Sequence, residues 1–195
     1  MKHENMFKIN YTSPVVRYTL QQRIGELLSL AKPHQPIVIV CIGTDRSTGD
    51  SLGPLVGSQL IKFRSELFHV YGTIANPVHA LNLTDTLFHI HSTFEQPFII
   101  AIDACLGQAS SVGYIQSNVG PVRPGAGVNK QLPAVGDVHI TAVVNVGGFM
   151  EYFVLQNTRL HLVMSMSEII SYSLFSAIVK HRKLMPKLAQ NITIN

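Results

Sequence analysis

Residues 37–60, IVIVCIGTDRSTGDSLGPLVGSQL, decide the fold of this chain. The stretch opens with an apolar run over residues 37–42 that is rich in β-branched side chains. Because the run is too short for an independent helix and too apolar for a sheet edge, it predicts a buried parallel strand. Gly43 ends the run, a polar loop covers residues 44–50, and apolar residues then return with helical spacing. The stretch therefore predicts a strand, a polar loop and a helix, in that order.

Strand and helix patterns also alternate along the rest of the chain. Runs typical of strands cover residues 68–74, 98–102, 113–117 and 138–146. Patterns typical of helices begin near Val16 and Asn82, and a last one extends from Thr158 to Lys183. Alternating strands and helices imply right-handed parallel crossovers. We therefore predict one α/β domain over residues 1–195, with three layers (α/β/α) and a mostly parallel central sheet.

The composition is that of a compact protein. Of the 195 residues, 46% are hydrophobic and only 13% are charged, which fits a sheet that is covered on both faces. The formal net charge is +4, but the 15 Lys and Arg residues are scattered and do not form a run or a stripe. We therefore expect no nucleic-acid partner.

Neither export nor membrane anchoring is expected from the sequence. Residues 1–10 contain no apolar segment of the kind found in signal peptides, and the chain has no uninterrupted apolar stretch long enough to span a membrane. The two cysteines, Cys41 and Cys105, lie in or beside predicted buried strands and do not make a disulfide framework. These features predict a protein of the reducing cytoplasm with no membrane partner.

Two aspartates stand where predicted strands give way to loops. Asp50 directly precedes a predicted helix, and Asp103 ends the strand pattern of residues 98–102. If those two strands are neighbours, as in doubly wound sheets of order 2-1-3, both carboxylates point into one crevice at the carboxyl ends of the strands. Facing carboxylates can share a proton and activate a water molecule, or they can hold a divalent cation. Taken singly, Asp50 could also be only an N-cap and Asp103 only the end of a strand.

Other candidate residues have weaker patterns. The loop at residues 43–49 lacks the Gly-Lys-Ser/Thr end of a P-loop and the G-x-G-x-x-G pattern of a dinucleotide-binding loop. The sequence therefore gives little support for a nucleotide site. Cys105 could be a nucleophile, but a buried thiol is more often inert packing. His139, near the start of a later strand, is the histidine best placed to approach the crevice, and its alternative is a half-buried strand residue. The glycine- and proline-rich segment 120–136 is predicted to be mobile or to change order on binding.

Four motifs closely resemble the YyaC-type sporulation proteins of spore-forming bacteria, over nearly the whole chain. They are CIGTDRSTGDSLGPLVG, PVHALNL, IIAIDACLG and VGDVHITAVVNVGGFMEYFVLQNTRL. More distantly, the first and third motifs are similar to the hydrogenase maturation endopeptidases and the spore germination protease. The resemblance implies an α/β/α fold of the phosphorylase/hydrolase-like type.

The resemblance also implies roles for particular residues. In the germination protease, the equivalents of TGDSLGP and IAIDA each supply an aspartate for peptide hydrolysis, and those positions here are Asp50 and Asp103. In the hydrogenase endopeptidases the same places supply acidic ligands that recognise nickel, joined by a later histidine whose counterpart here would be His139. This sequence departs from the acidic pair of the endopeptidases, because Gly49 occupies the first position and only Asp50 remains.

The leading hypothesis is a sporulation-associated, peptidase-like protein that acts on a protein or peptide substrate. Asp50 and Asp103 would form an acid/base pair, or a divalent metal ion held by Asp50, Asp103 and His139 would assist them. The alternative is a non-catalytic protein that keeps the fold and the crevice in order to bind a peptide, a metal or a partner, because a fold does not fix a function.

Overall fold

The computed structural model describes residues 7–125 and 132–192 of the chain. Its centre is a six-stranded sheet in the order β1-β5-β6-β4-β2-β3. The strands are β1 (Phe7–Asn10), β2 (Ile37–Cys41), β3 (His69–Tyr71), β4 (Phe98–Gly107), β5 (Tyr114–Val119) and β6 (Val138–Val146). Strand β5 is antiparallel to both β1 and β6, and the other neighbouring pairs are parallel. The predicted α/β architecture with a mostly parallel sheet is therefore confirmed.

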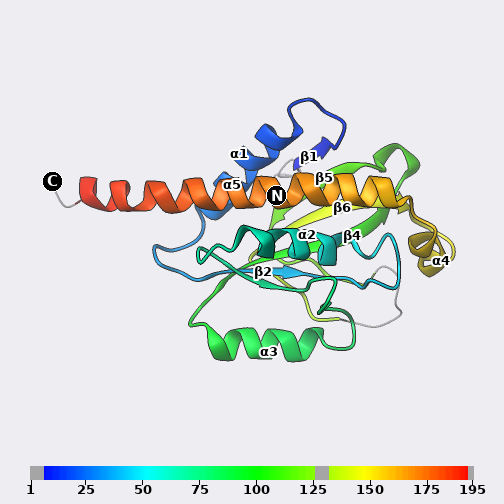
Figure 1. The fold of residues 1–195 in the computed structure, drawn as a ribbon, viewed down its shortest axis with the longest axis horizontal. Helices are drawn as coiled ribbons and strands as arrows, with labels where there is room; N and C mark the ends of the chain where they lie inside the picture. Colours follow the sequence, from blue (N-terminus) through cyan, green and yellow to red (C-terminus); the bar gives the residue numbers. More distant parts are fainter. Residues whose placement is uncertain (1–6, 126–131, 193–195) are drawn as a thin grey trace, which may run out of the picture.

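The helices cover the sheet unequally. They are α1 (Val16–Leu28), α2 (Leu52–Leu60), α3 (Leu83–Thr93), α4 (Glu151–Gln156) and α5 (Leu160–Ile192), with short 3-10 turns at η1 (Ile61–Phe63) and η2 (Ala109–Ser111). In Figure 1, α1, α2 and α5 lie on one side of the sheet, α3 lies on the other, and α4 lies beyond one end of the strands. The arrangement gives the three layers expected from the sequence.

Strand β2 lies in the interior of the sheet, between β3 and β4. All of its residues are buried, because successive side chains alternate between the two hydrophobic cores. Ile37, Ile39 and Cys41 join the core under α1, α2 and α5. Val38 and Val40 join the smaller core under α3. The local order β3-β2-β4 is the 2-1-3 arrangement that places residues from two strands at one crevice.

Glycines let α2 lie directly on the ends of the strands. A Cβ atom on Gly53 would overlap the backbone carbonyl oxygen of Ile42, and one on Gly57 would overlap the carbonyl oxygen of Gly72. Gly43 turns the chain out of β2 with a φ of +141°, a conformation that favours glycine. These contacts fix the start of α2 and therefore the loop that precedes it.

Helix α5 is the longest helix and forms much of the larger core. Its described inward residues include Val163, Met166, Ile170, Leu174 and Ile178, all of them buried. The part from Leu160 to Lys183 is long and apolar enough to cross a membrane, but its packing against α1 and α2 makes it a core helix. The helix starts at Leu160, and continues past the predicted end at Lys183. Leu160, which the periodicity places toward the sheet, is 55% exposed.

The structure corrects the predicted ends of several elements. Strand β4 does not stop at Asp103 but continues to Gly107, because β6 still pairs with it after β2 has ended. Asp103 therefore lies inside a strand. The pattern also missed β1 and α4, which are too short to show a clear period.

Only part of the glycine- and proline-rich segment 120–136 can be placed. Val122 and Val135 form an antiparallel bridge, and the Gly120 N–H donates to the Asp137 carbonyl at 2.7 Å. Residues 126–131 lie outside the described residues. The predicted mobility of this segment therefore stays a prediction.

Candidate active site

A cavity of about 580 Å³ lies beyond the carboxyl end of β2, beside β4. Its walls come from the loop after β2, the segment before α3, the middle of β4, α4, and the residues Pro124, Gly125 and Leu132. The polar or charged residues of the lining include Thr44, Arg46, Ser47, Asp50, His79 and Asp103. Most other lining residues are aliphatic. The cavity lies where open α/β sheets commonly bind ligands.

Asp50 is held by a tightly turned loop. The Thr44 N–H donates to the backbone carbonyl of Asp50 at 3.2 Å, and the Ser51 N–H donates to the carbonyl of Ser47 at 2.9 Å. The N-cap position of α2 belongs to Ser51, so Asp50 is not the N-cap that its sequence position also allowed. Its side chain instead lines the cavity.

Asp103 reaches the same cavity from the middle of β4. Its neighbours Ile102 and Ala104 belong to the core under α1, α2 and α5, so alternation along the strand directs Asp103 to the opposite face. The residue is only 7% exposed. The structure therefore brings together the two aspartates that the sequence singled out, Asp50 and Asp103.

The two carboxyl groups influence each other. Burial raises the pKa of Asp103 well above its usual value, and the negative charge of Asp50 raises it further, against a smaller lowering by the Ala104 N–H. Burial also raises the pKa of Asp50, while the Thr44 N–H and the electrostatic interaction with His79 act to lower it. Asp50 therefore ionises first and Asp103 keeps its proton to higher pH.

His79 is the site residue that the sequence reasoning missed. Its ring Nδ1 accepts a hydrogen bond from the Leu81 N–H at 3.3 Å, so in the neutral ring Nε2 carries the proton. Asn82 holds this turn, because its Oδ1 accepts from the His79 N–H at 2.8 Å and its Nδ2 donates to the Pro77 carbonyl at 3.0 Å. Asn82 does occupy the N-cap position of α3, but without the expected capping bond. The position of His79 after a predicted strand that neighbours β2 was the available signal.

His139 is not brought to the aspartate pair. It lies on β6 level with Ala101 of β4, whereas Thr141 is the residue level with Asp103. Its Nδ1 is 2.8 Å from the Gly120 carbonyl oxygen, and it is not part of the cavity lining. The expected place of His139 beside Asp50 and Asp103 is corrected accordingly, and His79 is the histidine at the cavity.

The side chains at the cavity do not fit a resident divalent metal ion with three protein ligands. Among residues 7–125 and 132–183, no three His, Cys, Asp or Glu side chains form a group that could hold one. The sequence of residues 126–131, AGVNKQ, contains none of these residue types. The expected ligand set of Asp50, Asp103 and His139 is not brought together at the cavity.

Cys105 lies two residues beyond Asp103 on the same strand. Burial raises the pKa of its thiol to about 11, despite a hydrogen bond with Thr141 that lowers it. The thiol is therefore protonated near neutral pH, where a nucleophilic cysteine would need to be a thiolate. This favours the packing role over the nucleophile.

Comparisons with known proteins agree with the fold and the motifs. Residues 8–173 match the family described as "Protein of unknown function (DUF1256)". The chain is 61% identical over 166 residues to the uncharacterized protein YyaC of Bacillus subtilis (strain 168), which covers 85% of this chain and 80% of that protein. The crystal structure of the NiFe hydrogenase maturation protease HycI from Thermococcus kodakarensis KOD1 matches with a TM-score of 0.50 and 16% identity, over 78% of this chain and 99% of that one. The likeness to HycI shows a shared fold. The family match and the identity to YyaC show that the chain belongs to the DUF1256 family.

Proposed function

We propose that this protein is a peptidase that hydrolyses peptide bonds of a protein substrate with Asp50 and Asp103 as its acid/base pair. The observation that carries the proposal is that both carboxyl groups line one cavity and both have raised pKa values. Raised and separated pKa values in one cleft are typical of acid/base catalysis. The protease-like fold agrees with this reaction class. A role in the cytoplasm of sporulating cells is part of the proposal and rests on the resemblance to the YyaC-type proteins.

The unequal pKa values assign the two roles. Ionised Asp50 accepts a proton from a water molecule, whose oxygen attacks the carbonyl carbon of the substrate. Protonated Asp103 gives its proton to the carbonyl oxygen, and a tetrahedral intermediate forms. When the intermediate collapses, one of its two hydroxyl groups returns a proton to Asp103 as the carbonyl reforms. The C–N bond breaks, and the leaving nitrogen takes the proton that Asp50 had accepted, so both aspartates regain their starting states. One water molecule is consumed, and the products are a carboxyl group and an amine.

The surroundings of the two aspartates support the assignment of Asp50 as the general base and Asp103 as the general acid. His79 and the Thr44 N–H favour the charged form of Asp50, which is the form that a general base requires. The strong burial of Asp103 favours its neutral form, which is the form that a general acid requires. The mainly aliphatic walls of the cavity lower the local dielectric, which strengthens these electrostatic effects.

The test is hydrolysis of a peptide library made from a digested bacterial proteome, with new termini identified by mass spectrometry. Asp50→Asn and Asp103→Asn should each lower the rate by about 10²–10⁴-fold, the usual contribution of a general acid or base. The double variant should be little slower than either single variant, because the two groups act as one unit. Asp45→Asn is the matched control, since Asp45 is an exposed aspartate of the same loop.

Two outcomes would contradict the proposal. A fully active Asp50→Asn or Asp103→Asn variant would exclude the pair as the catalytic groups. No hydrolysis by the wild-type protein, with or without added divalent metal, would favour the non-catalytic binding protein instead.

A further inference from the structure

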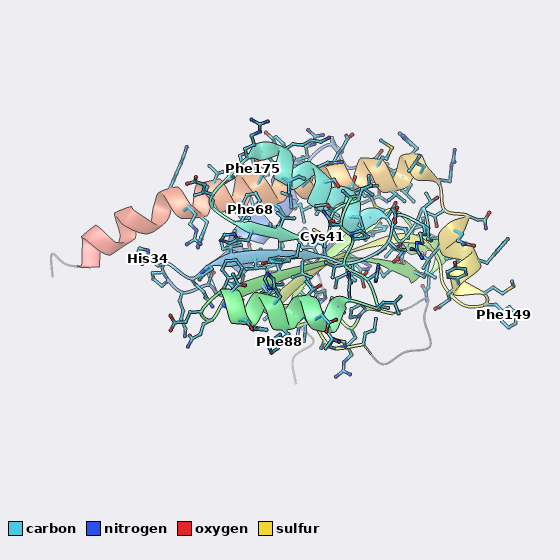
Figure 2. All side chains as sticks on the ribbon, turned by 60° about the horizontal axis from the view of Figure 1, so that its bottom comes forward. His34, Cys41, Phe68, Phe88, Phe149 and Phe175 are labelled. Carbon is cyan, nitrogen blue, oxygen red and sulfur yellow. The ribbon has the colours of Figure 1, made fainter. Side chains whose placement is uncertain are left out.

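The mouth of the cavity is bordered by exposed apolar side chains. Leu81 and Tyr152 both line the cavity, yet they are 76% and 60% exposed. Phe149, Met150 and Phe153 are also exposed, and they belong with Tyr152 to α4 and the turn that enters it. Phe149 is 89% exposed and projects from the end of the molecule in Figure 2. We name these five residues the apolar rim.

The rim is fixed to the loop that carries Asp50. The Gly49 N–H donates to the Leu155 carbonyl of α4 at 2.8 Å, and a side chain at Gly49 would meet Leu155. On the other side, the Asn145 amide of β6 donates to the Val154 carbonyl at 3.2 Å. A ligand that contacts the rim is therefore held at a defined place relative to Asp50.

The cavity also contains a polar group without a partner. Ser47 lines it and is only 5% exposed, and its hydroxyl has no hydrogen-bond partner among the residues that the structure describes. Leaving a buried hydroxyl unpaired costs about 1–3 kcal/mol, so a ligand that offers a hydrogen-bonding group there recovers part of that free energy. The aliphatic walls favour an apolar group at the same time.

A polypeptide segment meets both requirements, since it offers backbone N–H and C=O groups beside its side chains. We infer that the apolar rim and the cavity bind an extended polypeptide segment with large apolar side chains, with its backbone at Ser47 and the aspartate pair. The inference rests on the proposed function, whose substrate class it names. A cavity of about 580 Å³ can hold only a short part of such a segment, so the rim takes the residues that flank it.

Binding can be measured apart from hydrolysis in the full-length Asp103→Asn protein. The probe is a fluorescein-labelled peptide in which Leu and Phe alternate with Ser and Thr between terminal lysines, followed by fluorescence anisotropy. Adding Leu81→Ser or Tyr152→Ser should weaken probe binding by about fivefold or more, as expected for losing one apolar contact. Phe88→Ser is the matched control, because Phe88 is also 76% exposed but lies on α3 outside the cavity lining (Figure 2). This change should leave probe binding unaltered.

A second pair of variants tests the polar contact. Ser47→Ala should weaken binding of the same probe, and Ser117→Ala should leave it unchanged. Ser117 is the control because its hydroxyl is also buried without a partner among the described residues, but it lies on β5 away from the cavity. A peptide with Ala in place of Leu and Phe should bind more weakly to the parent protein, because it buries less apolar surface.

Several results would overturn the inference. One is that the Asp103→Asn protein does not bind the apolar probe. Another is that Leu81→Ser and Phe88→Ser weaken probe binding equally. A third is that sedimentation shows a dimer that the rim variants dissociate. The last result would assign the rim to a second copy of the chain. If the rim variants lose binding and the wild type hydrolyses nothing, only the proposed function fails. If hydrolysis occurs and the rim variants bind normally, only this inference fails.

Discussion

Asp103 is a buried carboxyl group in a strand whose neighbouring residues belong to hydrophobic cores. An ionised carboxylate in such surroundings is several kcal/mol less favourable than in water, so the folded protein keeps the proton on this group. Asn would occupy nearly the same volume without a charge. The presence of an aspartate at this position is not explained by stability, and the proposed reaction gives a reason for it.

The stability of the protein should therefore depend on pH through Asp103. Because folding raises its pKa above the usual 3.8, its contribution to stability is complete below about pH 3.8 and is lost as the pH rises through the raised pKa. Asp103→Asn removes this dependence. At neutral and higher pH the variant should be more stable than the wild type, and the difference should vanish in acid. Urea unfolding across this pH range is the measurement, and a variant less stable than the wild type at neutral pH would contradict the assignment.

The histidines show what could and could not be predicted at the scale of single residues. The placement of the two aspartates at one cavity was predictable because Asp50 lies in the loop after one strongly patterned strand and Asp103 stands where the apolar pattern of the neighbouring strand ends. The choice between His79 and His139 depends on the register of β6 against β4, which places His139 beside Ala101. No local pattern in the sequence encodes that register across the long segment 120–136, so the sequence alone does not show that His139 lies away from the aspartates.

At the scale of elements, the contact between α2 and the ends of β2 and β3 positions the Asp50 loop. It depends on Gly53 and Gly57, where side chains would overlap backbone carbonyl oxygens. Backbone atoms have little freedom to move away, unlike the end of a flexible side chain. Both glycines are therefore required for the helix to reach the sheet.

Gly53→Ala should destabilise the protein by about 1–3 kcal/mol or more, because the added methyl group forces α2 away from Ile42. Gly25→Ala is the matched control: Gly25 lies in α1 with no atom near the place of an added Cβ, so the change should stabilise by about 0.5–1 kcal/mol. Thermal unfolding of both variants tests the contact. Equal stability of Gly53→Ala and the wild type would show that α2 does not pack as described.

The elements that were predicted well are those with a strong period. The buried positions of α1 at Val16, Leu20 and Ile24 follow the helical pattern, and all of β2 follows the pattern of a central strand. The extension of β4 to Gly107 was hidden, because it depends on β6 pairing with β4 where β2 has already ended. Such an end is set by the partner strand and not by the residues of β4 alone.

At the scale of the whole molecule, the order β3-β2-β4 explains why a site could be predicted at all. The three parallel strands end near one another, so the segments that follow β2 and β3 meet the middle of the longer β4. The segment after β2 contributes Asp50, the segment after β3 contributes His79, and the middle of β4 contributes Asp103. Helix α4 completes the cavity from the C-terminal part of the chain, a contribution that only the three-dimensional fold reveals.

The most direct test of the account is an NMR titration of the protein with ¹³C-labelled aspartate carboxyl groups. We expect Asp103 to titrate well above the usual range and Asp50 to titrate at a lower pH than Asp103, though also above its own usual value, with Asp103 responding to the ionisation of Asp50. Asp50→Asn should lower the pKa of Asp103 because it removes the neighbouring negative charge, whereas Asp45→Asn should leave that pKa unchanged. Two aspartates that titrate independently in the ordinary range, or an Asp103 pKa that is unaffected by Asp50→Asn, would contradict the proton-sharing pair.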